Sequence, residues 1–184
     1  SCKFKIGDCK KWIEENPGVE LILTEKDIPG QNLFGVIPPF ADQPVLAREK
    51  TNFKGEAVAI IVGSYDYIKN LDIRTFPIYW EKIEESMSTK LSLKSKTKVY
   101  NRNFKNNILT SGLVKKGNIN SKNDTDVFVK GKLETSYVEH AYIETEAGSS
   151  WFDGDTLVIQ ACTQAPYMDR DDTAKILGLK PEKV

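Results

Sequence analysis

The stretch that decides the fold is AVAIIVG, residues 57–63, which is apolar throughout. Such a run is typical of a strand inside a β-sheet, because a strand covered on both faces carries apolar residues at successive positions. It is far shorter than the ~20 apolar residues that span a membrane. We therefore expect a central strand here, with the neighbouring segments packed around it.

Upstream of this strand, strand and helix signals alternate. A short alternating run at 3–6 and an apolar run at 19–24 predict strands, the second of them buried. Between them Asp8 can cap a helix over residues 8–16, which Asn-Pro-Gly closes. Thr24 can then cap a single helical turn, and the following Pro-Gly ends it.

Downstream of the strand, residues 64–73 carry apolar side chains at helical spacing, and residues 76–83 alternate as a strand does. Residues 85–124 are poorer in apolar periodicity and rich in Ser, Lys and Asn. We interpret them as a surface connection that carries one short helix around 86–93. The domain boundary is placed in this connection.

Beyond the connection the chain is rich in strand signals. Alternating patterns predict three strands, at 126–141, 141–151 and 155–163. The last two are joined at Asp153-Gly154, which is a hairpin signal. A helix is expected to begin near Tyr167 and to run over 169–179, with Gly178 close to its end. The sequence thus predicts an α+β fold.

The composition limits the class of protein. The chain has 184 residues, enough for one ordinary core or two small ones, and its 26 basic and 26 acidic residues cancel. This balance argues against a nucleic-acid partner, and the lysines between Lys90 and Lys116 are interpreted as a solvated loop. No run is long enough for a membrane span and no signal-peptide pattern opens the chain, so we expect a cytoplasmic protein.

Motifs for nucleophilic or metal chemistry are few. Cys2, Cys9 and Cys162 are odd in number and include no CxxC pair, which argues against a disulfide framework and against a zinc or iron–sulfur site. The sequence has no GxSxG, P-loop or GxGxxG motif. Local motifs by themselves leave the protein unassigned.

The segment YVEHAYIETEAGS, residues 137–149, holds the chain's only histidine, His140, among three glutamates. On a helix His140 and Glu144 could share a metal, but the alternating pattern favours a strand, where neither face gathers three ligands. Zinc hydrolases need two or three histidines. We expect a hydrogen-bonded structural histidine, and a general base remains open.

Three stretches resemble, in order and spacing, the molybdenum-binding subunit of the xanthine dehydrogenase and aldehyde oxidase family. They are LTEKDIPGQNLFGVIPPFADQPVLAREKTNFKGEAVAIIVG (23–63), YVEHAYIETEAG (137–148) and IQACTQAPYMDRDDTAKILGLKPEKV (159–184). The family's usual residues are replaced at three places, by Ala57, Val138 and Thr145. The second and third stretches are similar to the family's "QEHxYLEPE" and "STQxPxxxRxxxAxxLGLPxxxV" segments.

The resemblance implies a division of the chain into three parts. Residues 1–84 would form an α/β-hammerhead domain, in which the DIPG turn and a PVLA strand at 44–47 recur. Residues 85–124 would be a connecting segment. Residues 125–184 would form the first β-rich portion and helix of the molybdopterin-binding domain, truncated at its end.

The resemblance also implies one cofactor contact. The glutamine of the family's TQ pair approaches the molybdenum centre and donates a hydrogen bond to a ligand oxygen, and by position this is Gln164. The alternative is a solvated residue at a strand-to-helix turn. The metal is held by the pterin dithiolene, so His140, Glu144 and Glu146 are expected to be scaffold.

The function implied is that of a molybdenum hydroxylase. The parent would hydroxylate a carbon of a purine, a related N-heterocycle or an aldehyde, with water as oxygen source and with iron–sulfur and flavin subunits or domains as partners. The family's GGGFGGK stretch, substrate-binding arginine and catalytic glutamate are absent from these residues. A fragment that is inactive by itself is therefore expected, and the alternative is a non-catalytic assembly module.

Overall fold

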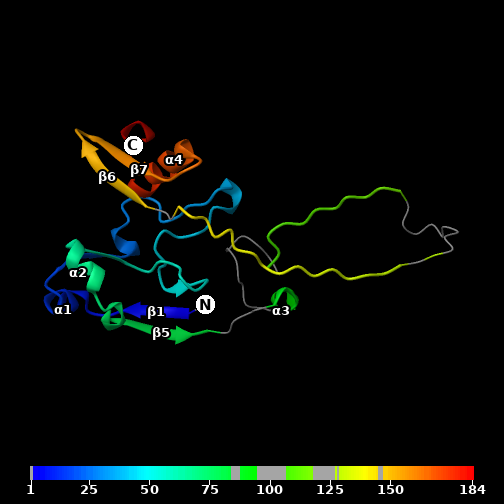
Figure 1. The fold of residues 1–184 in the computed structure, drawn as a ribbon, viewed down its shortest axis with the longest axis horizontal. Helices are drawn as coiled ribbons and strands as arrows, with labels where there is room; N and C mark the ends of the chain where they lie inside the picture. Colours follow the sequence, from blue (N-terminus) through cyan, green and yellow to red (C-terminus); the bar gives the residue numbers. More distant parts are fainter. Residues whose placement is uncertain (1, 84–87, 95–106, 118–126, 128, 145–146) are drawn as a thin grey trace.

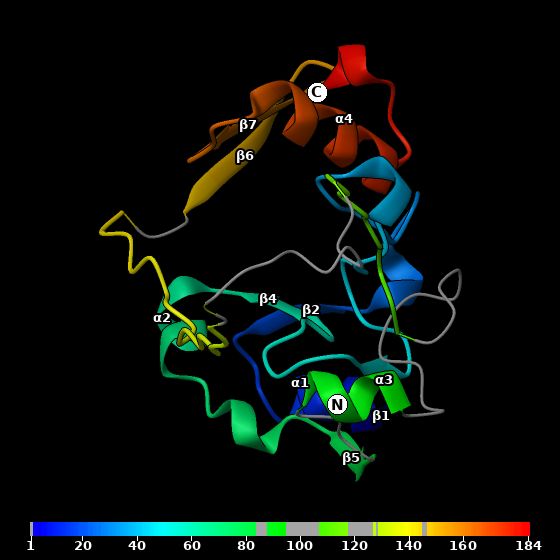
Figure 2. The same cartoon turned by 90° about the vertical axis from the view of Figure 1, so that its right-hand side faces the viewer.

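A computed structural model describes residues 2–83, 88–94, 107–117, 127, 129–144 and 147–184. Helices and strands are mixed along the chain, which confirms the expected α+β class. Figure 1 shows an N-terminal group of elements, a C-terminal hairpin with its helix, and a long excursion between them. Figure 2 shows the same two groups from the side, with segments of the N-terminal half running between them.

The N-terminal group contains two small antiparallel sheets. One has the order β3-β1-β5 and the other pairs β2 with β4. The strands are β1 (Cys2–Ile6), β2 (Val19–Leu23), β3 (Lys50–Thr51), β4 (Ile60–Gly63) and β5 (Ile78–Lys82). The α-helices are α1 (Cys9–Glu14) and α2 (Tyr65–Asn70), and short 3-10 helices are η1 (Glu25–Asp27), η2 (Pro38–Phe40) and η3 (Ile73–Thr75). The predicted strands at 3–6 and 19–24 and the helices at 8–16 and 64–73 are confirmed, with somewhat different bounds.

The core of this group centres on Trp12, which α1 turns inward. Asp8 caps the helix by accepting a hydrogen bond from the Lys11 N–H, as its position predicted. The Trp12 ring meets Phe76 edge to face at 5.4 Å, and its indole N–H donates to the Thr75 hydroxyl. An aromatic pair with its polar atom satisfied is a stable way to bury tryptophan.

The expectation for residues 57–63 is only partly met. Residues 60–63 do form a strand, β4, but it pairs with β2 alone and lies in a two-stranded sheet. Ile60 and Val62 remain 43% and 39% exposed, so the strand is not central. An apolar run indicates a strand that is buried on both faces. Within the described residues only one face of β4 is covered, by α2 and the Trp12 core.

The loop that follows β2 is closed by one asparagine. The Asn32 side chain donates to the Leu46 carbonyl at 2.7 Å and accepts from the Leu46 N–H at 3.0 Å. Leu46 and Ala47 are almost fully buried, although residues 44–47 form no strand. The PVLA strand implied by the resemblance is therefore wrong in form, because a side chain, not a neighbouring strand, satisfies Leu46.

The C-terminal group is a hairpin packed on a helix. It contains β6 (Gly148–Asp153), β7 (Thr156–Ala161), α4 (Pro166–Leu177) and η4 (Pro181–Lys183). The hairpin turns at Gly154, whose φ of 61° is easily adopted by glycine, as the Asp-Gly signal predicted. Leu157 from β7 and Ala174 from α4 are buried in this group.

The C-terminal end of α4 joins the two groups. Gly178 is left-handed (φ 69°) and ends the helix, as predicted, and Leu179 N–H donates back to Ala174 O. The next two carbonyls accept from the N-terminal half of the chain. Gly30 N–H donates to Ile176 O and Gln31 N–H to Lys175 O, both at 2.9 Å.

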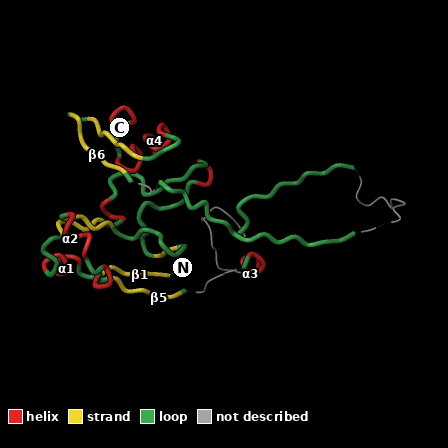
Figure 3. The backbone as a smooth tube through the Cα atoms, in the orientation of Figure 1, coloured by secondary structure: helices red, strands yellow, loops and turns green. Residues whose placement is uncertain are grey.

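The excursion between the groups carries fewer elements than the sequence predicted. The short helix expected around 86–93 is α3 (Thr89–Lys94), although 86–87 lie outside the described residues. Of the strand predicted at 126–141, the described residues form none, and of that at 141–151 only β6 is present. A strand needs a hydrogen-bonded neighbour, and none lies beside residues 129–144 among the described residues (Figure 3).

Gly30→Ala should weaken the join between the two groups. A Cβ at position 30 would lie 2.1 Å from Lys175 O, a backbone atom that cannot move without shifting α4. We expect a loss of about 1–3 kcal/mol in the free energy of unfolding, as for other overpacked sites. Urea denaturation followed by circular dichroism measures it.

The control is Gly112→Ala, where a Cβ would meet open space. That variant should stay within about 0.5 kcal/mol of the parent chain. Equal midpoints for the two variants would show that the close approach at Gly30 contributes nothing.

Asp27→Asn should reduce the loss of stability in acid. The backbone N–H of Thr24, and then its hydroxyl, hold the pKa of Asp27 below its ordinary value. A lowered folded pKa contributes stability that is complete above the ordinary value and is lost as the pH falls through the folded one. The free energy of unfolding should therefore fall less in the variant than in the parent chain. The comparison runs from a pH above the ordinary pKa of aspartate to a pH below the pKa of Asp27 in the folded protein. An unchanged decrease would contradict this assignment.

Candidate functional site

The turn that carries Gln164 joins β7 to α4. Its geometry is fixed by Thr163, whose hydroxyl accepts from the Ala165 N–H at 2.9 Å and donates to the Asp169 carboxylate. The N–H groups of Met168 and Asp169 donate to Ala165 O, which begins the helix. Hydrogen bonds within the chain therefore brace this turn on both sides of Gln164.

The helix begins at this turn for local reasons. Pro166 stands at the first helical position, where its missing N–H costs nothing and its φ suits a helix. Asp169 lies in the first turn, where a carboxylate suits the positive end of the helix dipole. The predicted start near Tyr167 is confirmed to within one residue.

Gln164 is exposed on this braced turn. Its side chain makes no hydrogen bond to any residue that the structure describes, so the amide can both donate to and accept from a bound group. The predicted position at a strand-to-helix turn is confirmed. A neutral amide at this place could orient an oxygen atom of a ligand without adding charge.

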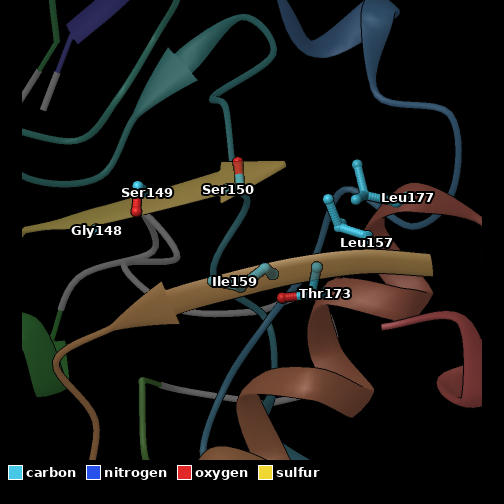
Figure 4. Close-up of a pocket in the computed structure, with 7 residues that line it drawn as sticks. All are labelled: Gly148, Ser149, Ser150, Leu157, Ile159, Thr173 and Leu177. Atoms are coloured by element: carbon cyan, nitrogen blue, oxygen red, sulfur yellow. The ribbon is translucent and has the colours of Figure 1, made fainter. Parts of the chain in front are cut away.

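A shallow groove of about 270 Å³ lies in the same C-terminal group but does not include Gln164. Figure 4 shows it between the hairpin and α4, with Leu157 and Ile159 from β7 and Thr173 and Leu177 from α4. Gly148, Ser149 and Ser150 of β6 complete the lining. No residue that lines it titrates near neutral pH, so the groove offers packing and hydroxyl contacts but no acid–base group.

His140 does not have the surroundings expected of it. It lies outside any strand, its side chain is exposed, and its one hydrogen bond within the described residues runs from its backbone N–H to the Glu139 carboxylate. The prediction of a hydrogen-bonded histidine on a strand is wrong in this structure, because none of the described residues pairs with the segment. Glu144 is also exposed, and Glu146 lies outside the described residues.

The other candidate groups are dispersed. Among the described residues no three His, Cys, Asp or Glu side chains lie where they could share a metal ion. Cys2 and Cys9 are half-buried and Cys162 is exposed. Burial, and then the Asp8 carboxylate, raise the pKa of the Cys9 thiol, which makes it a poor nucleophile. No helix in the described part of the chain has the length and apolar character to cross a membrane.

Comparison with known proteins gives this geometry a context. Residues 100–184, which include Gln164, α4 and the hairpin, match the family model of the molybdopterin cofactor-binding domain. The expected kinship with molybdopterin-binding enzymes is confirmed. The braced turn thus lies inside a stretch related to cofactor-binding domains.

Named relatives extend the match over nearly the whole chain. A probable xanthine dehydrogenase subunit of Bacillus subtilis is 27% identical over 178 residues, which is 96% of this chain and 23% of the relative. The nicotinate dehydrogenase large molybdopterin subunit of Eubacterium barkeri is 27% identical over 169 residues, 91% of this chain and 39% of the relative. Xanthine dehydrogenase 1 of Arabidopsis thaliana is 25% identical over 164 residues, 86% of this chain and 11% of the relative.

The chain therefore spans well under half the length of these curated relatives. The relatives are named as dehydrogenases of xanthine or nicotinate, so the class of enzyme to which the chain is related is oxidoreductase. This agrees with the resemblance inferred from the three sequence stretches.

The exposed Gln164 amide has the chemistry to orient an oxygen atom of a molybdopterin group. The Gln164 amide is exposed, neutral and able to donate, whereas the N–H groups of Ala165, Met168 and Asp169 are already bonded within the chain. The nearby Asp169 carboxylate is already engaged by the Thr163 hydroxyl. A single side chain can orient a group but cannot hold a cofactor of this size.

Sequence reasoning missed the pair that supports Gln164. Thr163 and Asp169 fix the turn, yet neither was singled out. Two signals were available. A threonine hydroxyl can accept from the N–H two residues on, and a proline followed by an acid in the first turn is typical of a helix start. Reading this signal would have placed Gln164 on a rigid support.

Thr163→Val should loosen the start of α4. The variant keeps the shape of the side chain but loses the oxygen that accepts from Ala165 N–H and pairs with Asp169. We expect a loss of about 0.5–1.5 kcal/mol in the free energy of unfolding for each of the two hydrogen bonds that the hydroxyl makes. Thr110→Val is the matched control, since Thr110 is exposed and forms no hydrogen bond within the described residues. Urea denaturation compares the two, and a Thr163 variant as stable as the control would show that the hydroxyl does not brace the turn.

Proposed function

We propose that this chain is part of the molybdenum-binding subunit of a molybdenum hydroxylase, and that Gln164 contacts the molybdenum centre. The observation that carries the proposal is the match of residues 100–184 to the molybdopterin cofactor-binding domain, with Gln164 exposed on its braced turn. Gln164 is the one residue of this chain that we assign to the cofactor.

The proposal includes a division of the chain. Residues 1–84 would be an α/β-hammerhead domain, 85–124 a connecting segment and 125–184 the first part of the molybdopterin-binding domain. In support, the N-terminal group has its own Trp12-centred core, and the hairpin and α4 form a separate group after the connection. The excursion between 107 and 144 separates them in the chain.

The reaction proposed is hydroxylation of a carbon atom in a nitrogen heterocycle or an aldehyde, with water as the source of oxygen. Two similar proteins are named for xanthine and nicotinate, which are both nitrogen heterocycles, and this favours the heterocycle over the aldehyde. Molybdopterin with its molybdenum would supply the two-electron oxidation when bound. Iron–sulfur and flavin subunits or domains would accept the electrons.

The role of this chain's own residues is positioning. The amide of Gln164 would donate one hydrogen bond to an oxygen at the metal, and Thr163 and Asp169 would keep that amide in place. The described residues supply no base of this chain beside Gln164, since the Asp169 carboxylate is held by Thr163. We therefore expect the 184 residues by themselves to be inactive.

Gln164→Ala should lower activity in the assembled, cofactor-loaded enzyme. Loss of a residue that orients a metal ligand typically costs 10–100-fold, and we expect kcat/KM to fall by about that factor. Gln160→Ala is the matched control, because Gln160 is an exposed glutamine on β7. Its kcat/KM should not change. Steady-state oxidation of xanthine or nicotinate, with molybdenum content measured in each preparation, gives the comparison.

Gln164→Glu separates orientation from simple space filling. Glutamate has the same shape but replaces the donor by a negative charge, so it should impair activity at least as much as alanine. A glutamate variant with full activity would exclude the proposed hydrogen bond.

The second candidate is a non-catalytic assembly module. The observation that favours it is the large exposed apolar surface between residues 107 and 144, which is typical of a region that contacts another protein. Molybdenum and pterin content of the protein purified from its natural host separates the two functions. Stoichiometric molybdenum supports the hydroxylase, and its absence from the purified protein supports the module.

A further inference from the structure

Residues 129–137, named here the unpaired arm, have the pattern of a strand but no neighbouring strand among the described residues. Apolar side chains recur on one face, at Val129, Leu133 and Tyr137, and polar ones occupy the other. The Lys132 ammonium lies 2.7 Å from the Glu134 carboxylate, which shows that positions two apart share a face, as in an extended strand. The arm is therefore amphipathic with the period of a β-strand.

The apolar face of the arm is fully open. Val129, Leu133 and Tyr137 are 86%, 90% and 105% exposed. No backbone hydrogen bond joins the arm to any residue that the structure describes. Figure 1 shows the arm far from both groups of elements, in the returning limb of the excursion. A row of free N–H and C=O groups beside an apolar face is a template for pairing with another strand.

The exposed area indicates how large the missing cover is. The chain exposes 16104 Å², whereas a compact protein of 20.7 kDa exposes about 8,900 Å². The excess is about 7,000 Å² on the same scaling. A homodimer interface of about 2,000–5,000 Å² in total hides about 1,000–2,500 Å² of each partner. The excess of the whole chain is therefore larger than one such interface would hide.

We propose that the unpaired arm becomes a strand of a β-sheet by pairing with another stretch of polypeptide. That stretch corresponds to the part of the relatives that lies outside the residues aligned with this chain. This inference rests on the proposed function, because it takes the cover to be the rest of a molybdopterin-binding subunit. The aligned residues are 23% and 39% of the first two relatives, so the remainder is large enough to enclose the arm. The apolar face turns toward that body and the Lys132–Glu134 pair faces away from it.

The test is site-specific crosslinking in the protein assembled in its natural host. The photoreactive residue p-benzoylphenylalanine replaces Leu133 on the apolar face or, as the matched control, Glu134 on the opposite face. After irradiation, crosslinked peptides are mapped by mass spectrometry. We expect crosslinks from position 133 to molybdopterin-binding sequence outside residues 1–184. The variant with the photoreactive residue at position 134 should give far fewer of these crosslinks.

Other outcomes overturn the inference. The inference is overturned if position 133 gives no crosslink. It is also overturned if the crosslinks reach a second copy of this chain, residues 1–184 of the same copy, or a protein of another class. Hydrogen exchange is the second measurement, and the amides of 129–137 should exchange at least about tenfold more slowly in the assembled protein than in the 184 residues expressed alone. Equal exchange would also overturn it.

Molybdenum analysis of the same preparations separates the two proposals. Stoichiometric molybdenum without the expected crosslink overturns the arm and leaves the proposed function in place. Crosslinks to the expected polypeptide without molybdenum support the arm and contradict the cofactor assignment.

Discussion

Two backbone hydrogen bonds, from Gly30 N–H to Ile176 O and from Gln31 N–H to Lys175 O, close the C-terminal end of α4. Carbonyls at a helix end have no partner within the helix, so another part of the molecule must satisfy them. Here that part lies in the N-terminal half of the chain. Because α4 has 12 residues, it holds Gln164, just before its first turn, about 18 Å from this join. The position of Gln164 in the molecule thus depends on residues more than a hundred positions away in sequence.

Much of the fold could be predicted where its cause is local. The Asp8 cap, the turn at Gly154 and the end of α4 at Gly178 each depend on one residue and its near neighbours, and all three were found from sequence. The position of Gln164 at a turn was predictable for the same reason. Its assignment to a cofactor came from the family resemblance, since one glutamine before a helix carries no such meaning by itself.

The rest could not be predicted because its cause is distant or lies in another part of a larger body. The run at 57–63 indicates an apolar strand but not how many strands lie beside it. The alternation at 126–141 indicates strand preference, yet residues 129–144 find no partner among the described residues. His140 fails for that reason as well, because an expected hydrogen bond requires a neighbour that sequence does not name. The join at Gly30 left no local signal beyond a Pro-Gly pair.

The loop closed by Asn32 has a consequence for how this protein can vary. Both hydrogen bonds of the Asn32 amide reach backbone atoms of Leu46, so the tie does not depend on which side chain position 46 carries. Between the two lie exposed apolar side chains such as Val36 and Ile37. Doubling the length of a closed loop costs only about 0.6 kcal/mol. Insertions between residues 33 and 45 should therefore lower stability only slightly. Related proteins could gain new surface features in this loop while the two groups keep their relative placement.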